Sequence, residues 1–309
     1  MTTVPPVPLT VIDAPSNLGL SPPEPGKEPG VRRMASALRR RGIVERLGAE
    51  DGGVVVPPAY SFDWDGKTVR NAAAIRRFSV ELAGRVGEEI GDGRFPVVLG
   101  GDCSILIGNM LALRRLGRYG LVFLDGHLDF RHPGNSPSVG AAAGEDLALV
   151  TGRGGKDLTD IERLGPLVRD GDVVALGERE GDPGTADVRE TGITVWDLAG
   201  VRGLGAAEAA ARAIARLDAG GVDGFWVHVD ADVLDDAEMP AVDSRQPDGL
   251  SRMELVEILR VLLGSGRALG MEVTIFDPDL DPTGEIAEGL TSALVQAFQT
   301  SGADTKEGA

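Results

Sequence analysis

Two short acidic segments carry the strongest chemical signal in the sequence. The first, Asp125-Gly-His127-Leu-Asp129, directly follows an apolar run, and the second, Asp230-Ala-Asp232, ends another. Side chains alternate along an extended chain, so the polar groups of each segment fall on one face and can converge. Several carboxylates buried together are prohibitively costly unless cations neutralise them, and mixed carboxylate and imidazole ligands suit Mn²⁺, Zn²⁺ or Fe²⁺.

Taken together, the two segments favour a two-metal hydrolytic site. Such a site holds its ions roughly 3.5–4 Å apart and shares carboxylates between them. A lone Asp-x-Asp after a strand more often caps the following helix. The presence of both segments in one chain indicates a metal centre instead.

The composition argues against several other classes of protein. The 309 residues include 31 Lys and Arg against 48 Asp and Glu, a net charge of −17, which repels phosphate backbones and anionic lipid. We therefore expect neither a nucleic-acid nor a membrane partner. A single cysteine excludes internal disulfides. The start MTTVPPVPLT lacks the charged and apolar regions of a signal peptide, so the sequence predicts a cytoplasmic protein.

Apolar runs alternate with helical patterns along the chain. The runs lie at 8–13, 53–57, 96–100, 120–125, 172–177, 193–196, 224–230 and 267–275. Helical patterns lie at 31–47, 70–90, 104–117, 157–169, 202–218, 251–264 and 284–300. Neighbouring parallel strands need crossovers, so this alternation predicts an α/β fold: a three-layer α/β/α, doubly wound, mostly parallel sheet of eight strands. We expect one catalytic domain over 1–309, with 301–309 as a disordered tail.

We predict that two segments rich in Gly, Pro and Ser form surface loops that follow strand ends. They lie at 14–30 and 131–145. Ligands of open α/β sheets bind at the carboxyl ends of the strands, so these loops are candidate walls of a site.

Four elements occur in the order and rough spacing of the ureohydrolases, the arginase and agmatinase family. They are Gly100-Gly101-Asp102-Cys103-Ser104, the two acidic segments, the second extended to Asp235, and the strand residue Glu272. The chain resembles that family from the run at 8–13 to the helical pattern at 284–300. The resemblance implies an arginase/deacetylase-like fold, a dinuclear manganese centre, and hydrolysis of a C–N bond in a small guanidino or amidino compound by a metal-bridging hydroxide.

The resemblance also implies a role for each matching residue. It makes Asp125 and Asp230 bridging ligands, His127 and Asp232 ligands of one ion, and Asp129 and Cys103 ligands of the other. Asp129 would also accept a hydrogen bond from the hydroxide. Glu272 resembles the carboxylate that grips the substrate guanidinium, a pairing that charge-assisted hydrogen bonds would orient.

Three departures from the family pattern bear on metal and substrate. Cys103 stands where the family has a histidine, which makes Zn²⁺ or Fe²⁺ possible besides Mn²⁺. The stretch 141–146 lacks the histidine that serves arginases in proton transfer, so Glu145, His132 or a metal-held water must protonate the leaving group, or the substrate must be activated, as an N-hydroxylated guanidine is. Arg131 replaces an asparagine that contacts substrate, and it could clamp a carboxylate.

A further histidine, His228, shares the carboxylate face of its strand and lies roughly 7 Å behind Asp230. The family tends to have a small residue there. Two interpretations stay open: a histidine that hydrogen-bonds a ligand carboxylate, or a satisfied core histidine. The predicted catalytic residues are thus Asp129, Glu272 and His228, and the predicted substrate-binding residues are Glu272, Arg131 and Glu145.

Two other functions remain as alternatives. The first is a catalytically silent member that binds a guanidino metabolite or serves as a scaffold, which the Cys103 exchange and the missing loop histidine allow. The second is a deacetylase-like metal amidohydrolase, although the chain has no adjacent histidines. By resemblance we also expect a homo-oligomer, a trimer or hexamer.

Overall fold

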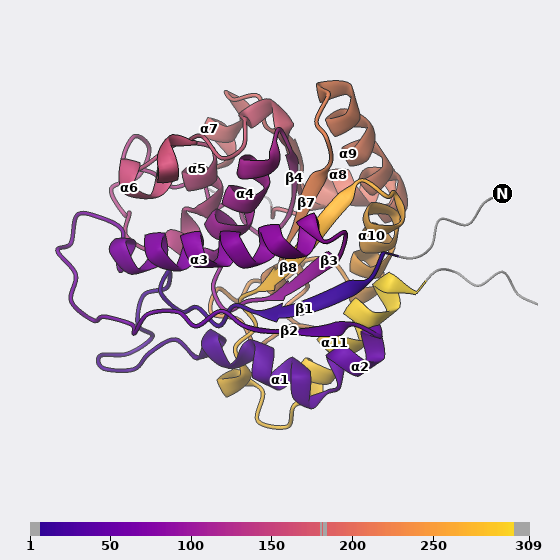
Figure 1. The fold of residues 1–309 in the computed structure, drawn as a ribbon, viewed down its shortest axis with the longest axis horizontal. Helices are drawn as coiled ribbons and strands as arrows, with labels where there is room; N and C mark the ends of the chain where they lie inside the picture. Colours follow the sequence, from indigo (N-terminus) through magenta and orange to yellow (C-terminus); the bar gives the residue numbers. More distant parts are fainter. Residues whose placement is uncertain (1–6, 180, 182–183, 300–309) are drawn as a thin grey trace, which may run out of the picture.

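A parallel sheet forms the centre of the molecule (Figure 1). The computed structural model describes residues 7–179, 181 and 184–299. Its eight strands lie in the order β2-β1-β3-β8-β7-β4-β5-β6, and every pair is parallel. The strands are β1 (Leu9–Asp13), β2 (Glu50–Val54), β3 (Phe95–Leu99), β4 (Gly120–Leu124), β5 (Val173–Leu176), β6 (Thr194–Trp196), β7 (Phe225–Asp230) and β8 (Ala268–Thr274).

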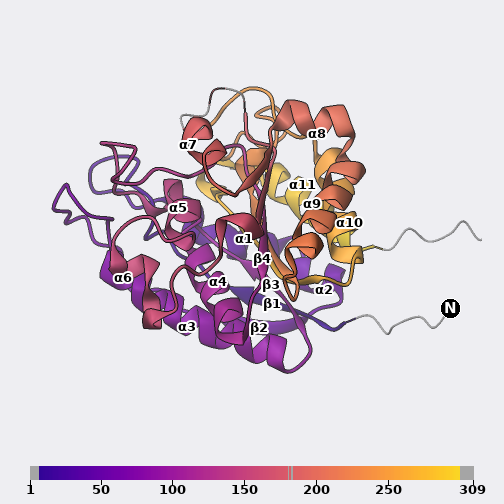
Figure 2. The same cartoon turned by 90° about the horizontal axis from the view of Figure 1, so that it is seen from above.

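Helices cover both faces of the sheet, as Figures 1 and 2 show. One layer contains α3 (Ala72–Gly91), α4 (Ile105–Leu116), α5 (Asp146–Val150), α6 (Lys156–Thr159) and α7 (Thr185–Arg189). The other contains α1 (Met34–Arg40), α2 (Ile43–Leu47), α8 (Leu198–Leu204), α9 (Ala206–Gly220), α10 (Arg252–Gly264) and α11 (Glu285–Phe298). None of the described helices is long and apolar enough to cross a membrane.

The two apolar cores explain why the strands are continuous apolar runs. In β4, Leu121 and Phe123 pack under the α3–α4 layer, whereas Val122 and Leu124 pack under the opposite layer. A strand buried on both faces has no position for an alternating polar residue. The predicted three-layer fold with eight strands is therefore confirmed.

Most predicted elements are present, with three differences among the helices. The helix predicted over 31–47 divides at Gly42, whose φ is 73°, into α1 and α2. The helix predicted over 157–169 is wrong, because α6 ends at Thr159 and a 3-10 turn follows at Ile161–Arg163. Pro166 lacks a backbone N–H and restricts the residue before it, so a helix cannot run through this segment. The helix predicted over 202–218 divides at Gly205, whose φ is 89°. Residue 300 and the predicted tail 301–309 lie outside the described residues.

The sheet order brings four strand ends to one edge. β3, β8, β7 and β4 are successive neighbours, so the segments that follow them meet there. Gly101, after β3, lies so close to the Ser16 carbonyl that a Cβ atom would overlap it. The backbone N–H of Ile275, after β8, donates to the Gly101 carbonyl at 2.7 Å. This close contact fixes the start of the segment that carries Cys103.

Gly101→Ala should lower the free energy of unfolding by about 3 kcal/mol, because the new methyl group meets backbone that cannot move aside. Urea denaturation measures the change. Gly87→Ala is the matched control: it lies within α3 with open space around it, and we expect a gain of about 0.5–1 kcal/mol. Equal small effects of the two substitutions would show that the Gly101 contact is not tight.

Candidate active site

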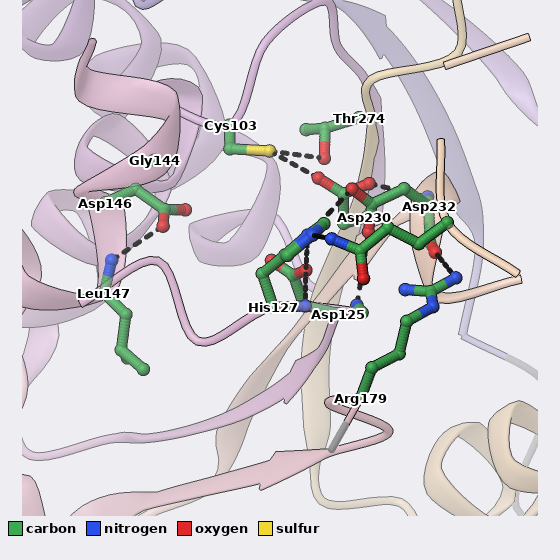
Figure 3. Close-up of polar contacts among 12 residues, drawn as sticks. Cys103, Asp125, His127, Gly144, Asp146, Leu147, Arg179, Asp230, Asp232 and Thr274 are labelled. Atoms are coloured by element: carbon green, nitrogen blue, oxygen red, sulfur yellow. Dashed lines mark hydrogen bonds and ion pairs between the residues drawn. The ribbon is translucent and has the colours of Figure 1, made fainter. Parts of the chain in front are cut away.

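Asp125, His127 and Asp232 converge at the ends of two adjacent strands. Asp125 follows β4, and Asp232 lies in a 3-10 turn directly after β7. His127 Nδ1 is 3.0 Å from Asp232 Oδ2 and 3.7 Å from Asp125 Oδ1 (Figure 3). One ligand atom from each residue lies within 4.8 Å of the others. This is a suitable arrangement for a metal ion.

The turns that carry these side chains are held by their own carboxylates. The backbone N–H of His127 donates to Asp125 Oδ1 at 2.7 Å, and that of Asp232 donates to Asp230 Oδ1 at 2.7 Å. A third bond, from the Gly126 N–H to Asp232 Oδ1 at 3.2 Å, links the two turns. These bonds leave the other carboxylate oxygen of each residue for other contacts: Asp232 Oδ2 approaches His127, Asp230 Oδ2 accepts from Cys103, and Asp125 Oδ2 has no partner among the described residues.

A second group of ligand atoms lies beside the first. Cys103 Sγ is 2.9 Å from Asp230 Oδ2 and 3.1 Å from Thr274 Oγ1 (Figure 3). Cys103, His228 and Asp230 also offer ligand atoms within 4.8 Å of one another, and all three are buried. Burial, followed by the charge of Asp230, raises the pKa of the Cys103 thiol well above its ordinary value. Without a metal, Cys103 is a neutral thiol that donates to Asp230.

The electrostatics of the acidic residues show how strongly this edge of the sheet needs positive charge. Burial raises the pKa of Asp125 to about 6, and the neighbouring Asp232 adds to the rise. Burial and the charge of Asp232 also raise the pKa of Asp230 well above its ordinary range. Burial opposes the charged form of His127, but contacts with Asp125 and Asp232 raise its pKa to about 12.

Unpartnered atoms give a direct test of whether these residues fit metal ions. Among the described residues, Asp125 Oδ2 and His228 Nε2 are buried and have no hydrogen-bond partner. Buried polar groups are nearly always partnered, so each such atom calls for an explanation. Carboxylate, imidazole and thiol groups that converge with free donor atoms fit divalent cations.

A pocket of about 440 Å³ opens over this edge of the sheet. Its volume suits a small molecule. Its polar lining includes His127, Asp129, Arg131, Asp230, Asp232 and Asp243. A small molecule in the pocket would contact the acidic strand ends directly.

Comparison with known proteins shows the family to which the chain belongs. The family model described as "Arginase family" matches residues 8–299. The chain is 30% identical to an arginase of Staphylococcus aureus (strain COL), over 94% of this chain and 96% of that protein. The chain belongs to the arginase family.

Two solved structures agree with this family membership. The native structure of arginase from Bacillus caldovelox superposes with a TM-score of 0.86 at 29% identity, covering 96% of this chain and all of that one. Arginase from Bacillus cereus gives a TM-score of 0.83 at 28% identity, over 95% and 99% of the two chains. The chain is therefore a ureohydrolase, a metal-dependent enzyme that hydrolyses amidino C–N bonds.

Two of the predicted substrate-binding residues of this arginase-family chain, Arg131 and Glu145, lie in different surroundings. Arg131 lies on the pocket wall, where its Nε donates to the Gly144 carbonyl at 3.2 Å. Glu145 is buried, and one of its carboxylate oxygens accepts hydrogen bonds from the backbone N–H groups of Gly140 and Ala141. Glu145 therefore shapes the loop, and its predicted contact with substrate does not fit this position.

Glu272 also differs from its predicted role. It is fully buried within β8 and pairs in register with His228 of β7. Its Oε1 lies 2.7 Å from His228 Nδ1, and its Oε2 accepts from Asn109 Nδ2. The residue after β8 that reaches the pocket is Ile275, at a φ of 73°. The assignment of Glu272 to the substrate guanidinium is therefore corrected: it lies beneath the pocket, and this wall of the pocket is apolar.

Besides Ile275, sequence reasoning missed three polar residues of the pocket lining. Asp243, Ser244 and Gln246 belong to the long loop between β7 and α10, and Gln246 Nε2 lies 2.9 Å from His127 Nε2. Only their place in the sequence could have indicated them, because they lie in the loop that follows the ligand-bearing end of β7. Burial, then the charge of Asp232, raises the pKa of Asp243.

A further missed residue, Asp146, begins α5 in the stretch that lacks the loop histidine. It is fully buried, and its Oδ1 accepts from the Leu147 N–H at 2.7 Å (Figure 3). Burial, followed by the charge of Asp129, raises its pKa well above the ordinary range. Burial and the charge of Asp129 thus favour the neutral form of Asp146.

Proposed function

We propose that the protein hydrolyses the C–N bond of a small guanidino or amidino compound with two divalent ions bound at the ends of β4 and β7. The observation that carries the proposal is the convergence of Asp125, His127 and Asp232 beside the pocket. When bound, a pair of such ions would lower the pKa of a water molecule and stabilise the negative charge that develops as that water attacks the guanidino carbon. Mn²⁺ is the metal implied by the resemblance, and Cys103 makes Zn²⁺ or Fe²⁺ possible.

The chain's own residues divide the remaining work. Asp129 lies on the pocket wall, where with cations bound its carboxylate can accept a proton from the attacking water. Asp243 lines the same pocket and can pair with the cationic end of the substrate. Ala143 lines the loop side, so that loop position supplies no proton donor. The pocket therefore favours a leaving group that is already activated, as in an N-hydroxylated guanidine.

Arg131 gives the pocket a second chemical preference. It lines the pocket together with the acidic residues, so a substrate with a cationic end and a carboxylate would pair with both. Arg131→Ala should raise KM about 10–100-fold for a carboxylate-bearing substrate, since a hydrogen bond to a charged group contributes roughly 1.5–3 kcal/mol. The decarboxylated analogue of the same substrate is the control. Equal changes in KM for both compounds would place Arg131 outside the recognition of the carboxylate.

The proposal is tested by metal analysis followed by a substrate screen. Protein purified without chelator is loaded with Mn²⁺ or Zn²⁺, desalted, and assayed for ions per chain. Loaded protein is then incubated with arginine, N-hydroxyarginine and decarboxylated guanidino compounds, and urea and amine products are measured. We expect about two ions per chain and metal-dependent turnover of at least one compound. Fully loaded protein that binds these compounds without turnover would favour the silent binding member instead.

Three further statements remain predictions. They are the homo-oligomeric state, the cytoplasmic location and the extent of one catalytic domain over 1–309. Sedimentation analysis of the purified chain tests the first: a mass of three or six chains would support it, and a monomer would contradict it.

A further inference from the structure

The ring of His228 is held in one orientation. Its side chain is fully buried. The ring stacks on Phe123 of the neighbouring strand, with centroids 4.6 Å apart and planes 9° from parallel. Its Nδ1 lies 2.7 Å from Glu272 Oε1. A ring fixed by stacking on one side and a hydrogen bond on another presents its remaining nitrogen in a defined direction.

Glu272 determines which ring nitrogen carries the proton. It lies between His228 and Asn109 of α4, and it accepts the Asn109 amide hydrogen with its second oxygen. A carboxylate that accepts at both oxygens requires an N–H at His228 Nδ1. In the neutral ring the lone pair is then at Nε2, and that atom has no partner among the described residues. A histidine whose far nitrogen is bound by a carboxylate is the usual form of a metal ligand.

The neighbours of His228 complete a ligand set. Cys103, His228 and Asp230 bring sulfur, nitrogen and oxygen atoms within 4.8 Å of one another. They come from three places: the segment after β3, the interior of β7 and its last residue. Thiolate and imidazole ligands favour Zn²⁺, whereas Mn²⁺ prefers carboxylate and water ligands. Three protein ligands also leave the open position of a catalytic zinc site.

We propose that His228 Nε2, Cys103 and Asp230 bind one of the two ions, as a zinc-selective site in which His228 replaces the imidazole absent from position 103. Binding displaces the thiol proton to solvent. Glu272 and Asn109 are positioning residues for His228, and Asp129 is left free for the attacking water. The inference rests on the proposed function only in placing two ions at this edge of the sheet.

Cobalt(II) tests the sulfur ligand, because a thiolate–cobalt bond gives a charge-transfer absorption that oxygen and nitrogen ligands lack. We expect this absorption in the wild-type protein, its loss in Cys103→Ser, and at least about tenfold weaker binding of that cobalt ion in His228→Gln. His132→Gln is the matched control, since His132 lies on the loop after Asp129, outside both ligand clusters. Unchanged cobalt affinity and absorption in His228→Gln would overturn the proposal.

A measurement on the unsubstituted protein avoids any folding defect of a core variant. The chain has three histidines, so ¹⁵N-labelled imidazoles give three separable sets of signals. On adding Zn²⁺, the rings of His127 and His228 should both shift, and the His228 ring should keep its hydrogen at Nδ1 while Nε2 takes the metal-bound shift. A shift of the His127 ring alone, with two zinc ions bound, would show that Cys103 and Asp129 hold the second ion without His228.

These outcomes separate the inference from the proposed function. Thiolate absorption and two shifted histidines in a protein that hydrolyses no guanidino compound would support the site and contradict the hydrolase. Turnover with two ions and no thiolate absorption would support the hydrolase and contradict the site.

Discussion

Asp232→Ala should remove one of the two ions and lower kcat/KM by about 10³-fold or more. Asp232 approaches His127 to 3.0 Å with one oxygen and links the two ligand-bearing turns with the other. Its removal therefore takes away a ligand and loosens a second. Each 1.36 kcal/mol lost from transition-state stabilisation lowers the rate tenfold, and metal ions contribute several kcal/mol. Elemental analysis and steady-state kinetics at saturating metal measure both effects.

The control for this variant comes from the same loop. Asp236→Ala removes a carboxylate that pairs with the exposed Arg245 at the surface, and it should leave metal content and kcat/KM close to wild type. Wild-type turnover of a confirmed substrate by Asp232→Ala would contradict the two-metal mechanism. A loss of activity with both ions retained would instead assign Asp232 a role other than metal binding.

Glu272→Ala should lower the free energy of unfolding by about 3–5 kcal/mol, because each buried donor left without its acceptor costs roughly 1–3 kcal/mol and the cavity adds to that cost. The substitution leaves His228 Nδ1 and Asn109 Nδ2 without their acceptor in the fully buried interior. Urea denaturation with excess chelator isolates this effect from metal binding. Glu257→Ala, on the exposed face of α10, should change the free energy of unfolding by no more than about 0.5 kcal/mol.

A second substitution, Glu272→Gln, distinguishes the role of Glu272 in positioning His228 from the substrate-binding role that the resemblance implied. Glu272→Gln keeps the shape of the side chain but not its charge, so we expect metal affinity to fall about 10–100-fold. At saturating metal, KM for substrate should stay near the wild-type value. A large rise in KM under those conditions would return Glu272 to the substrate site.

The strand ends could be predicted from sequence because the signal there is local. In β4 and β7, apolar runs buried on both faces stop at acidic residues, and parity along each strand gives the face of Asp125 and Asp230. The partners of Glu272 could not be predicted in this way. They depend on the register of β7 against β8, which pairs residues 44 positions apart, and no pattern within either strand encodes that register.

The pocket wall was beyond sequence reasoning for a different reason. Ile275 turns into the pocket at a φ of 73°, a conformation that β-branched residues rarely adopt. Asp243 and Gln246 lie in a loop without periodicity, so their direction depends on how that loop packs over His127. The direction of a side chain in the loop after a ligand-bearing strand is therefore harder to predict than that of a side chain within the strand, where directions alternate.

The different depths of the two histidines bear on the kinetics of metal exchange. His127 reaches the pocket surface, whereas His228 and Cys103 are fully sealed below it. We expect an ion held by Cys103 and His228 to enter and leave through the pocket, past the position of the outer ion. Loading should therefore be ordered, with the inner ion first, and a chelator should strip the protein in two phases, releasing the outer ion rapidly and the inner ion only afterwards.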